Sequence, residues 1–521
     1  DDFHAGIGDI KNIWEASRFE WVVTLARAYA VSGAGVYLDT LNRWLSDWVE
    51  KNPVNTGPNW KCGQEASIRI FNLLLASHIL KQTQNTSPAL QEFVYRHLER
   101  ISANIRYAVA QDNNHGTSEA AALFIGGLWC SGSASKDSIT AKRCGRFARQ
   151  GRKWLENRVR KLVEEDGSFS QHSVTYHRVL LDTLIFAEFW RRQFFAEPFS
   201  DLFYRRSQAA LDWLCAMTDD RSGNAPNLGA NDGAMLLHTH GCDYRDFRPS
   251  IQTASVLFRN QRSFAKGAWD EPGYWLGIIG THPGSDSLLS QDNKDSQVLP
   301  GGYVIMAGKE SWAMLRFPMF RFRPGHNDVF HFDLWHNGIN ICRDDGSYSY
   351  HPEEAASATY FGSVKAHNTV GFDDGEQMPQ LGRFLLGHWL SADQVGRIVE
   401  NEDGWRTWCG VYRDWRDNRH QRKVNWKENA WVVEDKLDGS FEKASIRYRL
   451  IADDYRLEGH RVFASWGRIE VSGTDLAICL VDGEESLYYQ QKQQVDVLEI
   501  RPGRRCHTIT TRIDLGMPSK S

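Results

Sequence analysis

The hydrophobic periodicity of the chain changes near residue 300. Between residues 10 and 264, apolar side chains mostly recur every three or four positions, as they do on one face of a helix. This spacing predicts helices over residues 64–82, 88–110, 116–130, 140–164, 173–194 and 198–218. Many helices joined by short loops, with no repeat of fixed period, favour helical hairpins closed into a toroid over a linear solenoid.

From about residue 300 onward, the pattern is typical of strands and turns. Short alternating or β-branched stretches occur at 302–307, 312–317, 329–335, 339–343 and 431–435. His336-Asn337-Gly338 separates two of them, and Asn-Gly favours the primed turns of β-hairpins. We therefore expect an α+β, multidomain chain, with an (α/α) toroid over residues 1–295 and an antiparallel β-sandwich over residues 296–521.

Composition narrows the classes of function. The 65 acidic residues slightly outnumber the 61 basic ones, and a net charge of −4 does not favour nucleic acid as the main partner. No run of about 18 apolar residues is free of charges, so no membrane span is expected. The nine cysteines lack CxxC spacing, and most are expected to be buried thiols. The 20 tryptophans fit either large cores or flat platforms for sugar rings.

The first cluster that could carry chemistry is Asn113-Asn114-His115, which precedes an apolar run. Thr117 or Ser118 is expected to cap the helix that this run predicts. Asn114 and His115 would then lie just before a helix N-terminus, where free N–H groups and the helix dipole favour an anion. An amide donor there could bind a carboxylate. The alternative is that both residues only turn and cap the chain.

The second cluster follows the turn Asp166-Gly167-Ser168. Tyr176 is expected in the first turn of the next helix, about one turn after His172, so the two side chains can share a helix face. A Tyr at a cleft, flanked by His or Arg, can act as a general acid or base. The alternative is a Tyr packed in the core with its hydroxyl satisfied.

The third cluster contains His326, His331, Asp333, Asp344 and His367 in the predicted β half. Two His residues and a carboxylate from separate β segments are sensible ligands for a borderline metal such as zinc. The alternative is that these are hydrogen-bonded His residues within a sandwich.

Taken in chain order, these clusters resemble the heparinase II/III-like group of polysaccharide lyases, which is related to alginate lyases of toroid architecture. The resemblance extends over roughly residues 10–370 and implies an incomplete (α/α) toroid followed by an antiparallel β-sandwich. The matching stretches are Trp14-Glu15-Ala16-Ser17-Arg18, Gly57-Pro58-Asn59-Trp60 with Glu65 and Arg69, Asn113-Asn114-His115, residues 166–177, residues 226–233 and residues 325–350.

The resemblance also implies β-elimination at a uronic acid of an acidic polysaccharide. Groups that bind the sugar carboxylate stabilise the charge that develops when the neighbouring proton leaves. The resemblance gives this role to Asn114, with His115 as a second neutraliser or as the base. It makes Tyr176 the acid, and also the base where both groups act on one side of the sugar. His326 is a further catalytic candidate, because some relatives place this His close to the sugar.

In the β half, the resemblance implies a divalent metal, zinc, held in a structural role by His326, Asp344 and His367. Two positions depart from the pattern of the family. Pro324 occupies the place where many relatives have a second His, and Ser118 the place where some relatives have a Glu. Mechanisms that need either residue are therefore not expected here.

An anionic polymer needs cations along its binding site despite the net charge of −4. Trp60 and Trp335 are candidates for sugar stacking, with core packing as the alternative. The expected substrate-binding residues are Asn59, Trp60, Glu65, Arg69, His172, His177, Arg178, Asn231, Arg323 and Trp335.

Two other functions stay open from the sequence. A toroid glycoside hydrolase would need two carboxylates across a cleft, with Glu65, Glu119 and Asp232 as conceivable members. A non-catalytic glycan-binding protein of the cell envelope would bind without turnover. An acidic polysaccharide is the expected partner, and a periplasmic or secreted location follows from that substrate. The sequence does not specify an oligomeric state.

Overall fold

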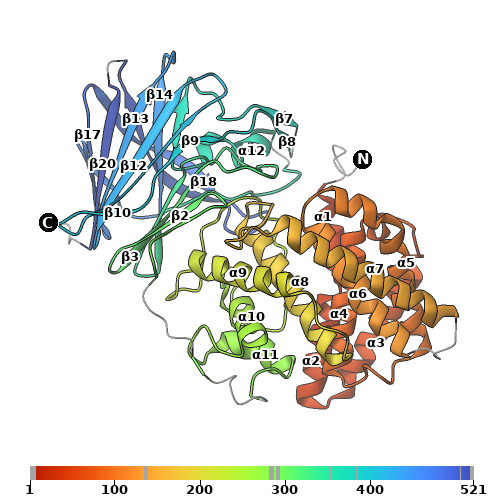
Figure 1. Ribbon diagram of the computed structural model, residues 1–521. Coiled ribbons are helices and arrows are strands. Elements are labelled where there is room, and N and C mark those ends of the chain that lie inside the picture. Colours follow the sequence, from red (N-terminus) through yellow and green to blue (C-terminus); the bar gives the residue numbers. More distant parts are fainter. Residues whose placement is uncertain are drawn as a thin grey trace. The chain divides into compact units, whose positions relative to one another are not determined.

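The computed structural model describes residues 8–133, 139–280, 287–288, 294–352, 355–382, 385–504 and 506–516. The chain forms two compact units, which Figure 1 shows coloured along the sequence. The helical unit comprises Asp1–Ser170, Tyr176–Leu214 and Ala234–Ser290, and the sheet unit comprises Gln171–Thr175, Cys215–Gly233 and Gln291–Ser521. Helices precede strands along the chain, as predicted. The domain boundary expected after residue 295 stays a prediction.

In the helical unit, helices buried almost all round alternate with helices buried along one face. The more buried series is α4 (Gly63–Ile79), α6 (Asn114–Ser133), α8 (Val174–Gln193) and α10 (Arg248–Arg259). Helix α2 (Glu20–Ser32) is buried along one face, through Val22, Val23 and Ala26. The amphipathic series is α3 (Gly35–Lys51), α5 (Pro88–Ala110), α7 (Ile139–Leu162) and α9 (Asp201–Met217). The short helices are α1 (Ile10–Ala16), η1 (Pro58–Trp60), η2 (Ala268–Asp270) and α11 (Glu271–Trp275). Because α4 packs against α5 and α6, and α6 against α5 and α7, the helices pair as in an (α/α) toroid.

Local sequence signals explain where several helices begin and end. The Ser87 hydroxyl accepts a hydrogen bond from the backbone of Leu90 and Pro88 takes the first helical position, so α5 begins as predicted. Gly33, in the left-handed region with φ 69°, ends α2. The six predicted helical stretches are confirmed as α4 to α9. No helix within the described ranges is long and apolar enough to cross a membrane.

The described part of the sheet unit contains two large antiparallel sheets and a small hairpin. The first sheet has the order β1 (Gln297–Leu299), β2 (Tyr303–Ala307), β3 (Ser311–Arg316), β4 (Phe332–His336), β5 (Ile339–Cys342), β14 (Ala444–Leu450), β19 (Gln493–Pro502) and β18 (Leu476–Glu485), with β6 (Val370–Phe372) paired to β14. The second has the order β10 (Val399–Glu400), β11 (Arg406–Arg413), β12 (Arg419–Lys427), β13 (Ala430–Asp438), β20 (Thr508–Leu515), β17 (Gly467–Ser472), β16 (Arg461–Ala464) and β15 (Arg456–Glu458), with β9 (Ala392–Val395) paired to β11. The hairpin is β7 (Gln380–Gly382) with β8 (Leu385–Leu386), and the helices of this unit are α12 (Ala355–Tyr360) and η3 (Val364–Ala366).

One hydrophobic core lies between the two large sheets, as a sandwich requires. Buried side chains of both sheets contribute to it, among them Phe332, Ile446, Trp408 and Trp431. At the end of β4 the predicted Asn-Gly hairpin is confirmed, because Asn337 has φ 49° and Gly338 has φ 85°. The sequence therefore forms the predicted antiparallel β-sandwich.

Candidate active site and metal centre

His115 lies at the start of α6, between a thiol and a carboxylate. Its Nδ1 is 3.8 Å from the Cys62 sulfur and 3.6 Å from Glu119 Oε1, one helical turn later. Gly63 leaves the room that the Glu119 carboxylate needs, because a Cβ there would lie 2.3 Å from Glu119 Oε2. Nε2 of His115 makes no hydrogen bond to the described residues, and the side chain is 26% exposed. Nδ1 is thus held from inside, while Nε2 stays available to a ligand.

The helix that carries this site begins earlier than the sequence predicted. Asn114 is the first residue of α6, and the Asn113 side-chain oxygen accepts a hydrogen bond from the backbone of His115 at 3.0 Å. Thr117 lies inside the first turn and donates to the carbonyl of Asn114 at 2.9 Å, so the prediction that Thr117 or Ser118 caps the helix is wrong. Asn113 does so instead, which draws Asn114 and His115 into the first turn, at the positive end of the helix dipole.

The surroundings of His115 favour its cationic form. Burial lowers the pKa of this imidazole, but Cys62 and the Glu119 carboxylate outweigh burial and raise the pKa above its ordinary value. Burial also raises the pKa of Glu119, against the opposing effect of His115. A cation beside the free N–H groups of a helix start is a suitable site for an anion.

Replacing Glu119 with Gln is expected to lower the pKa of His115 by roughly one to two units, because the partner that stabilises the imidazolium is lost. In the native chain the raised pKa implies a stabilising contribution that is complete below the ordinary imidazole pKa and is lost as pH rises through the raised value. Titration of the His115 ring by NMR measures the shift. Glu156→Gln, on the neighbouring helix α7, is the matched control. An unchanged His115 pKa in Glu119→Gln would show that Glu119 does not set the charge of this ring.

Tyr176 lies in the first turn of α8 and is 8% exposed. One contact joins the segments that precede α8 and α6, and a second joins the two helices themselves. The Ser170 hydroxyl donates to the carbonyl of Asp112 at 2.9 Å, and the Ser118 and Thr183 hydroxyls lie 3.5 Å apart. The N-terminal ends of α6 and α8 therefore lie at the same end of the helical unit, which brings Tyr176 to the end that carries Asn114 and His115.

The expected sharing of a helix face by His172 and Tyr176 is wrong. His172 precedes α8 and has φ 51°, in the left-handed region, so helical spacing does not apply to it. Its ring packs edge-on against Phe320 in the sheet unit. Burial and the charge of Arg316 lower the pKa of His172 well below its ordinary value, so this ring is neutral at pH 7.

An open cavity of about 740 Å³ lies in the helical unit, between residues 57–61 and helix α5. Its lining includes the predicted Gly57-Pro58 turn and Trp60, together with Lys61 and Arg100. Arg100 donates to the backbone carbonyl groups of Trp60 and Lys61, at 2.7 Å and 2.6 Å. Arg100 carries no distinguishing sequence signal, because it occurs as one charged residue in an ordinary amphipathic helix.

Other predicted substrate residues near this turn are buried. Trp60 is 1% exposed, and its ring centroid lies 4.5 Å from that of His97, which is core packing. Arg69 donates to the carbonyl of Asn59 at 2.8 Å, and Glu65 accepts two hydrogen bonds from Arg18 at 2.8 and 2.9 Å. These side chains support the wall behind the cavity, and contact with a substrate stays a prediction.

Two further predicted binding residues, His177 and Arg178, are packed among aromatic rings. His177 stacks on Trp213 at 4.2 Å, and burial lowers its pKa to about 4. The Arg178 guanidinium lies 4.3 Å from the ring of Tyr244 and 4.7 Å from that of Phe247. Both side chains are almost fully buried in the helical unit, so they stabilise the fold around α8.

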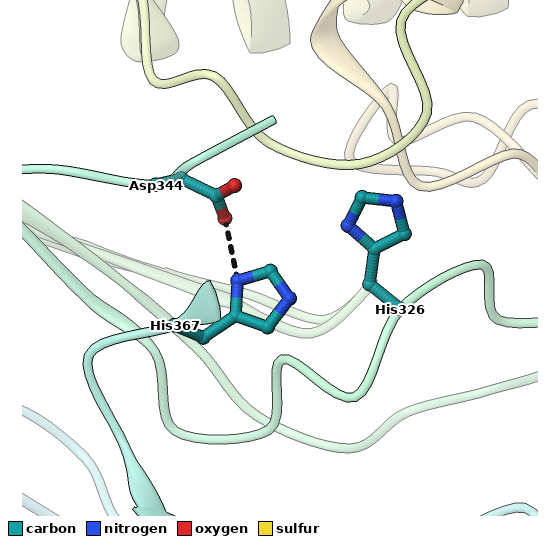
Figure 2. A group of neighbouring side chains, drawn as sticks. All are labelled: His326, Asp344 and His367. Atoms are coloured by element: carbon teal, nitrogen blue, oxygen red, sulfur yellow. Dashed lines mark hydrogen bonds and ion pairs between the residues drawn. The ribbon is translucent and has the colours of Figure 1, made fainter. Parts of the chain in front are cut away.

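In the sheet unit, His326, Asp344 and His367 come together from three segments (Figure 2). Their potential ligand atoms all lie within 4.8 Å of one another, and His367 Nδ1 lies 3.0 Å from the Asp344 carboxylate. His326 Nδ1 and His367 Nε2 are buried and have no hydrogen-bond partner among the residues that the structure describes. Because unpaired buried nitrogens are costly, two free imidazole nitrogens beside a carboxylate fit a zinc-type metal ion.

The electrostatics of this cluster suit a cation. Burial, helped by the charge of His367, lowers the pKa of His326 to about 4, so its ring is neutral. Burial opposes the charge of Asp344, but His367, His331 and His326 hold the pKa of Asp344 well below its ordinary value. A neutral His326 and an ionised Asp344 are the protonation states that metal binding needs. Burial lowers the pKa of His367, but Asp344 outweighs burial and raises it, so a metal ion bound there would displace a proton from His367.

Asn368 holds the segments of two of these residues in register. Its Nδ2 donates to the carbonyl groups of Phe332 at 2.9 Å and Arg343 at 3.1 Å, and its Oδ1 accepts from the backbone of β14 at 2.6 Å. Asn368 follows His367, and Arg343 precedes Asp344. One fully buried amide thus supports two candidate ligands, as second-layer groups do in metal sites.

His331 behaves as an ordinary hydrogen-bonded histidine of the sandwich. Its Nδ1 accepts from the backbone N–H of Asn368 at 3.0 Å, and its Nε2 lies 3.4 Å from the Asp333 carboxylate. Both ring nitrogens therefore have partners. His331 therefore fits the alternative to a metal ligand, a hydrogen-bonded His within the sandwich.

The remaining predicted residues of the sheet unit lie in different environments. The Ser347 hydroxyl, 3.3 Å from His326 Nε2, accepts from the backbone N–H of Asn231 at 3.1 Å. Trp335 is 1% exposed and stacks on the neighbouring Trp312 ring, as in a core. Arg323 is exposed and has no partner among the described residues, so its guanidinium can meet an anion.

Both halves of the chain match known families and structures. The model for the heparinase II/III N-terminus matches residues 9–232, and that for the heparinase II/III-like C-terminal region matches residues 291–510. A heparin-sulfate lyase of Bacteroides thetaiotaomicron is 21% identical over 418 residues, which cover 74% of this chain but only 55% of the length of that relative.

Among solved structures, a heparinase III matches with a TM-score of 0.70 and 16% identity, over 96% of this chain and 77% of the other. The heparan sulfate lyase HepC from Pedobacter heparinus matches with a TM-score of 0.62 and 16% identity, over 100% of this chain and 79% of the other. At this identity the likeness shows the fold. It confirms the predicted toroid followed by a β-sandwich.

Proposed function

Because the chain belongs to the heparinase II/III-like family, we propose that it is a lyase that cleaves a uronic-acid-containing polysaccharide by β-elimination. The observation that carries this proposal is the pairing of His115 with Glu119 beside Asn114, at the start of α6. A cation, an amide and a helix dipole together suit a sugar carboxylate. A heparin-like glycosaminoglycan is the first substrate class to test, since the relative from Bacteroides is named a heparin-sulfate lyase.

Different residues of the helical unit can bind the sugar carboxylate and transfer the proton. Asn114 and the His115 imidazolium bind the sugar carboxylate, which makes the proton on the adjacent carbon more acidic. Tyr176 removes this proton, the electron pair forms a carbon–carbon double bond, and the glycosidic C–O bond breaks. Tyr176 then returns the proton to the leaving oxygen. No water is consumed, so the two products together have the mass of the substrate.

We further propose that His326, Asp344 and His367 hold zinc in a structural role. Two buried imidazole nitrogens without partners support this assignment, as does the ionised state of Asp344. Bound there, the metal ion would connect three segments of the sandwich and stabilise the fold. Whether His326 also acts on the sugar stays a prediction. The substrate class places the activity in the periplasm or outside the cell.

The metal assignment predicts about one zinc per chain after dialysis against metal-free buffer, measured by plasma mass spectrometry. Asp344→Asn is expected to lose most of this zinc and to unfold at a lower temperature, because the metal then has two neutral ligands. His420→Gln is the matched control, since His420 is an equally buried His paired with a carboxylate, Asp435, at 2.7 Å. A native chain that takes up no zinc from excess zinc chloride would contradict the assignment.

Ultraviolet absorbance tests the proposed reaction. Elimination forms a carbon–carbon double bond conjugated to the carboxylate, and this product absorbs where the substrate does not. We expect the absorbance to rise on incubation with heparin, heparan sulfate or another uronate polymer. New reducing ends without this absorbance would instead favour a hydrolase. The arrangement offers little for hydrolysis, because Glu65 is bound to Arg18 and Glu119 faces His115. Silence of both assays on every polymer would contradict the proposal in favour of a binding protein.

A further inference from the structure

Helix α7 carries a concentration of positive charge that the proposed reaction does not use. Its 24 residues include nine Lys or Arg and one carboxylate, Glu156, in a chain whose net charge is −4. The amphipathic helices α3, α5 and α9 instead mix acidic and basic residues. The excess on α7 is therefore a local feature of the helical unit.

Five of these cations form one stripe along the helix. Successive members are separated by four, three, four and seven residues, so all five lie on one face, opposite the buried face that includes Cys144, Gly151 and Leu155. At 1.5 Å per residue the stripe is about 27 Å long. The members of this basic stripe are Lys142, Arg146, Arg149, Lys153 and Arg160.

The stripe is exposed and its charge is not neutralised from within the described part of the chain. All five side chains are classed as exposed, and none has an ion pair with a described carboxylate. By contrast, other cations of α7 are paired, as Arg143 is with Glu99 at 3.0 Å and Lys161 is with Asp112 at 2.7 Å. The outward face is thus the part of α7 whose charge is left for a partner.

The arrangement weakens the helix on its own. Lys142 and Arg146, Arg146 and Arg149, and Arg149 and Lys153 are like-charged neighbours at helical spacing, which destabilises a helix. Lys142 also lies in the first turn, where the helix dipole disfavours a cation. A local conflict of this kind is expected where a sequence serves binding, because an anionic ligand relieves the repulsion.

We propose that this stripe is an auxiliary binding site for a linear anionic polysaccharide, separate from the residues assigned to the reaction. A stripe of this length, with four of its cations about 4.5 to 6 Å apart along the helix axis and the fifth about 10 Å further, matches an extended polyanion better than a small anion. The choice of a polysaccharide over another polyanion rests on the proposed lyase function. The site would hold a long substrate on the enzyme while another part of the same polymer reacts.

Fluorescein-labelled heparin tests the site by anisotropy across a range of salt concentrations. All proteins carry Tyr176→Phe, so that the ligand is not degraded. The test variant is Arg146→Gln/Arg149→Gln/Lys153→Gln. The matched control is Arg43→Gln/Arg106→Gln/Arg205→Gln, which removes the same charge from exposed positions, one on each of α3, α5 and α9. We expect the test variant to bind heparin at least about tenfold more weakly, with a salt dependence shallower by roughly two to three ions.

The control variant is expected to bind heparin within about twofold of the parent, since its cations do not form a stripe. Circular dichroism is expected to show both variants folded. Equal losses in the two variants, or a parent that does not bind heparin, would overturn the proposal. So would a loss confined to labelled double-stranded DNA, which would make the stripe a nucleic-acid site. Failure of the lyase proposal is distinguishable, because it appears as absent product absorbance whatever the anisotropy shows.

Discussion

Replacing Tyr176 with Phe is expected to lower the rate of double-bond formation by about 10²–10⁴-fold, the usual contribution of a positioned acid or base. The phenolic hydroxyl is the only group removed, and the ring continues to fill its place at the start of α8, where the side chain is 8% exposed. Substrate binding should therefore change little, so the loss appears in kcat and not in KM. The measurement is the initial rate of product absorbance on heparin or heparan sulfate.

Tyr204→Phe is the matched control for this experiment. Tyr204 lies in the same unit on α9, and its hydroxyl donates to Glu188 at 3.0 Å, a structural hydrogen bond. We expect this variant to lose some thermal stability and to keep its turnover. If Tyr176→Phe retained a rate within about threefold of the native chain, Tyr176 would not be the acid or base.

Replacing Asn114 with Ala is expected to reduce kcat by about 10²–10³-fold, because an amide that stabilises the developing charge is lost. Asn114→Asp should be at least as impaired, since a second carboxylate would repel that of the sugar. Asn42→Ala, an exposed amide on α3, is the control that should leave turnover unchanged. A native-like kcat in Asn114→Ala would remove Asn114 from the mechanism.

Much of the architecture could be predicted from periodicity and turn chemistry. Ser87-Pro88 and Gly33 are local signals that fix one end each of α5 and α2, and the start of α5 was predicted. The Asn337-Gly338 hairpin likewise depends on φ values that few other residues adopt. These elements were predictable because their causes lie within a few residues of chain.

The site was harder to predict because its geometry depends on packing between distant segments. Sequence spacing alone could have indicated Glu119, because it lies one helical turn after His115. No nearby sequence feature predicts that the Cys62 sulfur lies 3.8 Å from the same ring. The burial of Arg69 and His177 likewise depends on which helix faces are covered. A cationic residue in a motif can therefore support a site from behind as well as line it.

The choice between core packing and sugar stacking also required the three-dimensional structure. Trp60 and Trp335 each pack against another ring and are 1% exposed, although their sequence contexts fitted either role. The metal cluster could be predicted in part, since its residue types and their positions in β segments suggested zinc. The support given by Asn368 could not be predicted, because its hydrogen bonds join segments up to 81 residues apart in the sequence.

The central claim is that the chain cleaves its polymer by elimination, and the masses of the products from one defined heparan sulfate oligosaccharide test it most directly. Elimination adds no atoms, so the two fragments must sum to the mass of the substrate, and one of them must carry the absorbing double bond. The account predicts this result for the native chain and unchanged substrate for Tyr176→Phe. Fragments whose masses sum to the substrate plus one water, without the absorbance, would contradict it.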